Sequence, residues 1–65
     1  VRRATVRRVA LHELRIGQVL LAGVETVDGL LVIPTGVELT RAHLQRLRNF
    51  ARLSGIREPI PVREP

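Results

Sequence analysis

Apolar residues gather in two runs near the middle of the chain, Val19–Val24 and Leu30–Ile33, and an Asp28-Gly29 pair lies between them. Asp-Gly between aliphatic runs is typical of a β-hairpin, because both central residues of a type I′ turn need positive φ angles. A loop one or two residues longer, with Gly29 as the left-handed residue of a bulged turn, is also compatible with these residues. The pattern therefore predicts a hairpin with arms Gln18–Val24 and Leu30–Ile33.

Both arms are apolar at consecutive positions rather than at alternate ones. A strand of this kind is covered on both faces, and a chain with one helix cannot cover both faces of its own sheet. A second copy of the chain, or the rest of a parent protein, is therefore expected on the outer face. A register shift of one residue would exchange the inward and outward sets. The candidate contact residues are Leu20, Ala22, Val24, Leu31 and Ile33.

A helix is expected over about 41–53, with Thr40 as its N-cap and Gly55 just beyond its end. Leu53 falls nearly opposite the apolar side of this helix, so it either belongs to a frayed last turn or touches a second surface. The apolar side itself should pack on the hairpin, as expected of an amphipathic helix. It consists of Leu44, Leu47 and Ala51, with Phe50 beside them.

Shorter extended segments flank this centre. Thr5–Leu11 fits a short strand with Val6 and Val9 on opposite faces. Pro59–Val62 is typical of an edge strand, because prolines at alternate positions cannot donate hydrogen bonds to a neighbouring strand. The expected fold is α+β: a small, mainly antiparallel, barrel-like sheet of three or four strands with the helix packed on it.

The 65 residues are expected to form one small domain, with residues 1–4 flexible and 63–65 a tail. A chain of this size buries only roughly 60% of the surface that its unfolded form exposes, so its own core gives marginal stability. No apolar run approaches the ~20 residues that cross a membrane. We therefore expect a cytoplasmic module that is a fragment of a longer protein.

The chain carries eleven arginines and no lysine against six acidic residues, a net charge of +5. A basic chain can bind an anionic partner such as nucleic acid, or its charge can reflect a composition bias without function. Phe50 is the only aromatic residue, so the chain offers no platform on which bases could stack. Nucleic-acid binding is the alternative hypothesis. Its residues would be Arg41, Arg48 and Arg52 on one side of the helix, with Arg2, Arg3, Arg7 and Arg8.

Residues that could carry chemistry form no recognisable site. His12 is followed by Glu13, but neighbours in an extended chain point to opposite faces, and no third partner is apparent. Ser54, the only serine, stands where the helix is expected to end. No spacing of histidines and carboxylates matches a metal site, and no glycine-rich phosphate loop is present. We expect no enzymatic activity, no catalytic residue, no cofactor and no metal.

Four stretches of the chain follow a known pattern: LRIGQVL from Leu14, DGLLVIPTGVELT from Asp28, LQRLRNFA from Leu44 and GIREPIPV from Gly55. They resemble a small module found beside receiver and HD-type phosphohydrolase domains in bacterial two-component response regulators. The resemblance covers about Leu11 to Val62. Gly23 stands where that pattern commonly has Asp, and Gln18 where it has Met.

The resemblance implies an accessory module in signal transduction, and together with the two-faced apolar arms it leads us to expect a non-catalytic accessory or dimerisation module. Such a module would act through protein–protein contacts, as a homo-oligomer or against its parent chain. It carries over no catalytic residue, and the metal-binding His-Asp pair of the HD domains does not occur in these stretches.

Overall fold

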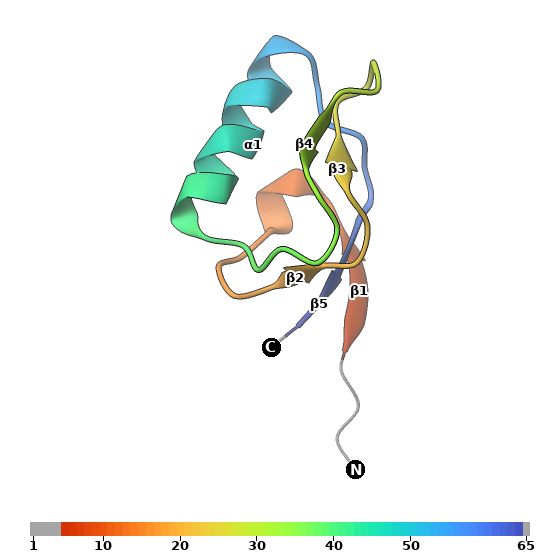
Figure 1. The fold of residues 1–65 in the computed structure, drawn as a ribbon, viewed down its shortest axis with the longest axis vertical. Helices are drawn as coiled ribbons and strands as arrows, with labels where there is room; N and C mark the ends of the chain where they lie inside the picture. The colour runs from red at the N-terminus through yellow and green to blue at the C-terminus, as the bar shows by residue number, and fades with distance from the viewer. Residues whose placement is uncertain (1–4, 65) are drawn as a thin grey trace.

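Antiparallel strands and one helix make up residues 5–64, the part of the chain that this computed structural model describes (Figure 1). This confirms the α+β class. No closed barrel is found among these residues, so the barrel-like arrangement is not confirmed. In chain order the elements are β1 (Val6–Val9), the short 3-10 helix η1 (Leu11–Glu13), β2 (Val19–Leu20), β3 (Val24–Glu25), β4 (Leu31–Ile33), α1 (Arg41–Leu53) and β5 (Ile60–Arg63).

The predicted hairpin is formed by β3 and β4, and its turn is the three-residue loop Val27–Gly29. Thr26 N donates to Leu30 O (2.9 Å), and Gly29 N donates to Thr26 O (3.0 Å). Gly29 has φ +94°, a left-handed conformation that glycine adopts at little cost. The hairpin therefore has the longer, bulged turn rather than a two-residue one.

The predicted first arm, Gln18–Val24, is wrong as a single strand, because it is divided between two sheets. β2 pairs with β5, whereas β3 pairs with β4, and the chain bends at residues 21–23 between them. A Cβ added to Gly23 would lie 2.8 Å from Leu31 Cδ1, so glycine makes room there for the opposite arm. The apolar run Val19–Val24 carries no sign of such a bend, because it continues through the residues at which the chain bends.

The C-terminal strand was predicted at an edge and lies instead in the centre of a three-stranded sheet with the order β1-β5-β2. Pro61 is compatible with this central place because β2 ends at Leu20, which pairs with Val62, so Pro61 lies beyond the paired part of β2. Leu21 N donates to Pro61 O (3.0 Å) just beyond the end of β2, and the nitrogen of an extended residue faces the same side as its carbonyl. The missing N–H of Pro61 therefore costs the sheet no bond to β1.

The predicted tail over 63–65 is also partly wrong. Arg63 ends β5, and Glu64 N donates to Thr5 O (2.9 Å), which extends the pairing with the segment before β1. Residue 65 lies outside the described residues, as do residues 1–4, for which flexibility was expected.

Helix α1 has the predicted bounds and the predicted caps. Thr40 Oγ1 accepts from His43 N (3.4 Å), and Thr40 N donates to His43 Nδ1 (3.1 Å), so the two residues cap each other. At the other end Gly55 has φ +86°, and its N–H donates to Phe50 O (3.1 Å). This is the left-handed end that the sequence predicts.

The core lies between α1 and the strands, and every strand contributes to it. Leu47 is the fully buried side chain of α1, and Leu44 packs partly against the same cluster. Both sheets therefore depend on one shared core. Its buried apolar residues are Val9, Leu14, Leu20, Val24, Ile33, Leu39, Leu47, Ile60 and Val62.

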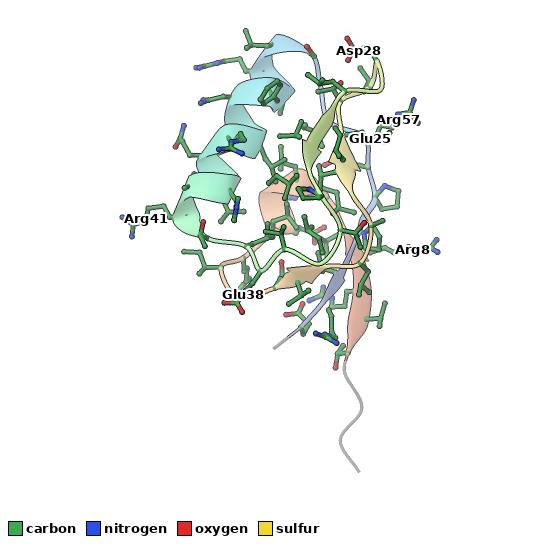
Figure 2. The ribbon with its side chains drawn as sticks, viewed as in Figure 1. Arg8, Glu25, Asp28, Glu38, Arg41 and Arg57 are labelled. Carbon is green, nitrogen blue, oxygen red and sulfur yellow. The ribbon has the colours of Figure 1, made fainter. Side chains whose placement is uncertain are left out.

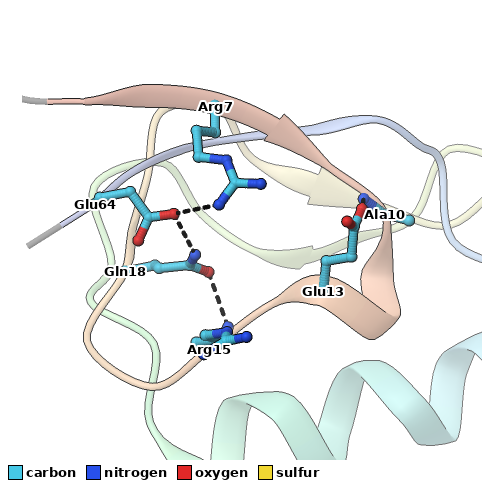
Figure 3. A network of polar contacts seen from close by, with 6 residues as sticks. All are labelled: Arg7, Ala10, Glu13, Arg15, Gln18 and Glu64. Carbon is cyan, nitrogen blue, oxygen red and sulfur yellow. Dashed lines mark hydrogen bonds and ion pairs between the residues drawn. The ribbon is translucent and has the colours of Figure 1, made fainter.

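A buried polar side chain, Gln18, joins the two ends of the chain (Figure 3). Its Oε1 accepts from Arg15 N (2.8 Å), and its Nε2 donates to Glu64 Oε1 (3.0 Å). The same carboxylate oxygen accepts from Arg7 Nη1 (3.4 Å). Because buried polar groups are costly unless they are paired, this network fixes the end of β5 between β1 and the segment that leads into β2.

Candidate interaction surface

Large apolar side chains are exposed on the hairpin and at the end of α1, and the hairpin turn and the helix end both lie at the top of Figure 1. Val27, Leu30 and Leu31 each expose more than half of their surface, and Leu53 exposes 79%. Val27 N donates to Gly55 O (3.1 Å), so the turn lies against the residues that follow the helix. We call Val27, Leu30, Leu31 and Leu53 the hairpin surface.

The structure divides the contact residues expected from the sequence into two groups. Leu20, Val24 and Ile33 are almost completely buried in the core, so they are not available to a partner. Ala22 and Leu31 are exposed. The expected set therefore needs correction at three positions, because β2 and β3 turn Leu20 and Val24 inward while the bend between them leaves Ala22 outside.

Val27, Leu30 and Leu53 were not among the expected contact residues. Leu30 belongs to the apolar run of the second arm, and Leu53 falls nearly opposite the buried side of the helix. The sequence therefore contained an indication that each of these two leucines could be exposed. Val27 carried no such signal, because a turn residue is expected to be exposed whatever its polarity.

Charges of both signs border the hairpin surface. Asp28 lies in the turn, while Glu25 and Arg57 lie on neighbouring segments, since Arg57 N donates to Glu25 O (2.9 Å) (Figure 2). The three side chains are exposed or partly exposed. An apolar surface with such a border has the composition of a protein contact, whose centre is apolar and whose rim is polar.

The hairpin turn is held by Thr26, a buried residue whose hydroxyl donates to Asp28 Oδ1 and accepts from Leu30 N (3.0 Å). The hydrogen bond from Thr26, followed by one from the backbone of Asp28 itself, lowers the pKa of the Asp28 carboxyl. Asp28 is thus a charged side chain with a fixed position at the tip of the hairpin.

The three-stranded sheet has an exposed outer face of its own. The register sets Arg63 opposite both Val6 and Val19, and Pro61 opposite Arg8. Val6 is exposed by 61% and Leu21 by 39%. This face differs from the hairpin surface because its apolar side chains alternate with arginines.

The arginines expected on one side of the helix, Arg41, Arg48 and Arg52, are all exposed. Among residues 5–64, the ion pair that is formed joins Arg7 to Glu64 (3.4 Å) rather than any of these three. Arg2 and Arg3, the other arginines of the nucleic-acid hypothesis, lie outside the described residues.

A surface pocket of about 480 Å³ lies between η1, α1 and the segment after the helix. Its charged lining combines Arg48 with Glu58, whose carboxylate accepts from Leu11 N. His12 also lines it, whereas Glu13 turns away to accept from Ala10 N (2.9 Å). A lining with charges of both signs favours no single charge class of ligand.

Between residues 5 and 64, His, Asp and Glu side chains nowhere gather in a group of three or more that could hold a metal ion. The same residues include no helix of the length and apolar character needed to cross a membrane.

The chain matches no protein-family model, no curated protein and no solved structure.

Proposed function

We propose that this chain is a non-catalytic interaction module that binds a second copy of itself through the hairpin surface. The observation that supports the proposal is the exposure of Val27, Leu30, Leu31 and Leu53 at one end of the molecule. Burying apolar side chains of this size contributes roughly 25 cal/mol for each Å² removed from water.

The charged border favours a second copy as the partner. A two-fold axis brings the same surface of both copies together. If one residue of the first copy contacts a second residue of the other copy, the reverse contact is formed as well. Glu25 and Asp28 of one copy can then face Arg57 of the other. A border with charges of both signs is self-complementary in this way, whereas a border of one sign would repel its copy.

The wider role that we propose, that of a cytoplasmic accessory module in a bacterial response-regulator-like protein, rests on the sequence resemblance alone. In such a protein the module would hold two copies together, and any phosphohydrolase chemistry would belong to another domain of the parent chain.

The proposal is tested by measuring molar mass with light scattering across a concentration series. We expect a monomer–dimer equilibrium for the natural chain and a shift toward monomer for the Leu30→Ser/Leu31→Ser double variant. Both leucines are exposed, so the double variant should remain folded. The matched control is Leu21→Ser, an exposed leucine just beyond the end of β2, which should leave the dimer unchanged. A monomer at every concentration, or a dimer that ignores the double variant, would overturn the proposal.

Nucleic-acid binding is the second candidate, and one observation favours it: Arg41, Arg48 and Arg52 are all exposed on one helix. Neutralising phosphates releases counterions, so binding to an oligonucleotide should weaken steeply as salt rises. Replacing the three arginines by glutamine should weaken that binding and reduce its salt dependence without changing the molar mass. Binding that does not depend on salt would contradict this candidate.

A further inference from the structure

Strand β1 leaves one of its edges open. It pairs with β5 on one side, and within residues 5–64 no strand pairs with its other side. The outer edges of β2 and β3 are bridged instead: Val19 of β2 pairs with Glu38, and Thr26, which follows β3, pairs with Ile56. The open edge of β1 is therefore the place in the three-stranded sheet where a further strand can be added.

The hydrogen-bonding groups on this open edge belong to Val6 and Arg8. Glu64 N donates to Thr5 O (2.9 Å), which fixes the alternation along the pair. Thr5 and every second residue after it turn their backbone groups toward β5, whereas Val6 and Arg8 turn theirs away. Both residues are exposed, so an incoming strand would meet free N–H and C=O groups.

The side chains of β1 indicate the chemistry of that strand. Arg7 and Arg8 occupy the two central positions, with Val6 and Val9 at the ends. Residues directly opposite each other in neighbouring strands interact, and opposite charges or apolar pairs stabilise the pairing. Arg8 points into solvent on the outer face (Figure 2), and Arg7 already attracts the carboxylate of Glu64 (3.4 Å).

We propose that β1 binds an extended acidic segment of another protein by strand addition, with the pattern apolar-acidic-acidic-apolar opposite Val6–Val9. Because Val-Arg-Arg-Val reads the same in both directions, this pattern holds for a parallel or an antiparallel partner. The backbone bonds supply affinity and the arginines supply selectivity, as in other cases of strand addition. This site uses none of the hairpin surface, so it is independent of the proposed dimer.

A second copy of this chain is a poor occupant of the same edge. If the outward groups of Val6 in each of two antiparallel β1 strands paired with those of Arg8 in the other copy, Arg7 of one copy would lie opposite Arg7 of the other. Like charges directly opposite each other destabilise strand pairing. The charge that protects the edge from self-pairing is the same charge that would attract an acidic strand.

The test is a titration of the ¹⁵N-labelled chain with a short blocked peptide that has Val-Glu-Glu-Val at its centre, followed by NMR. We expect shifts centred on the amides of Val6 and Arg8 and an affinity that falls with salt. Two control peptides, with Val-Lys-Lys-Val and with Glu-Val-Val-Glu at the centre, should bind weakly or not at all. The second has the same composition as the test peptide but places its acids opposite Val6 and Val9.

Variants of the chain separate backbone pairing from simple charge attraction. Val6→Pro removes an outward N–H and keeps both arginines, so it should weaken the peptide about tenfold, while Val6→Thr should bind as the natural chain does. Arg8→Glu should lose the acidic peptide. The proposal is overturned if Val6→Pro binds normally, if the shifts centre elsewhere, if no shifts occur, or if an oligonucleotide shifts the same amides equally.

Discussion

The hairpin and the helix form one region of this molecule, and the three-stranded sheet forms another. In the first, pairing partners lie close together along the chain: the β3–β4 turn spans Val27–Gly29, and Thr40 caps the helix through His43. In the second, β1 pairs with β5, so that Val9 lies opposite Ile60. The first region is held by local signals and the second by contacts between the two ends of the chain.

This difference has a physical consequence. Bringing distant segments together costs conformational entropy that only later contacts offset. The three-stranded sheet therefore depends more strongly than the hairpin on the shared core and on the buried Gln18–Glu64 contact (3.0 Å). Substitutions can test this difference, because each should destabilise the hairpin and helix, the three-stranded sheet, or both.

Leu47→Ala should have the largest effect, because Leu47 is fully buried in the core that both regions share. Truncating a buried leucine costs about 2–5 kcal/mol, a large part of the roughly 3–10 kcal/mol that holds a domain of this size. Urea unfolding followed by circular dichroism measures it. Leu53→Ala, at the exposed end of the same helix, is the control and should change the free energy of unfolding by less than about 0.5 kcal/mol.

Gln18→Leu should weaken the three-stranded sheet selectively. It leaves Arg15 N without its partner and the Glu64 carboxylate with Arg7 alone, at a cost of about 1–3 kcal/mol. Amide exchange should accelerate at the end of β5 and in β2 more than in the hairpin. Gln45→Leu, on the exposed side of α1, is the matched control. Uniform acceleration in both regions would contradict the distinction between them.

Thr40→Ala tests the local region by removing the hydroxyl that accepts from His43 N (3.4 Å). Loss of such a cap costs about 0.5–2 kcal/mol. Exchange should increase in the first turn of α1 and leave β1 and β5 unchanged. Thr35→Ala, at an exposed threonine of the preceding turn, should have no measurable effect. An equal effect of the two substitutions would show that the cap contributes nothing.

The smallest effect concerns the pH dependence of the hairpin. The pKa of Asp28 is lowered, chiefly by the hydrogen bond from Thr26, so the ionised carboxyl favours the folded state. The ionised Asp28 carboxyl contributes its full share to the free energy of unfolding above the ordinary pKa of about 3.9. This contribution is lost as the pH falls through the lowered pKa. Carbon-detected NMR titration of this carboxyl measures the shift directly. The Thr26→Val variant should return the pKa toward 3.9, and an ordinary value in the natural chain would contradict this account.

The same division explains which parts of the fold could be predicted. The bounds of α1, its caps and the hairpin position follow from local chemistry, since Thr40, Gly29 and Gly55 each act within a few residues. The place of β5 at the centre of its sheet could not be predicted in this way. Pro61 is typical of an edge, and only the short length of β2, together with Leu21, makes a central position possible.

The sequence predicted that the hairpin would have an exposed apolar surface, but of the expected contact residues only Leu31 belongs to it. Two faces of apolar side chains in the arms indicated that part of the hairpin would stay exposed, and Leu31 does so. Leu20, Val24 and Ile33 lie inside because the bend at residues 21–23 resets the alternation between β2 and β3. Such a bend depends on tertiary contacts, here the approach of Leu31 to Gly23, and no local periodicity records it.

The proposed dimer is tested most directly by comparing amide spectra of the natural chain at low and high protein concentration. A dimer through the hairpin surface predicts concentration-dependent shifts confined to Val27, Leu30, Leu31, Leu53 and their neighbours, while β1 and β5 stay unchanged. Shifts that centre on the exposed arginines of α1 instead, or spectra that do not change with concentration, would contradict it.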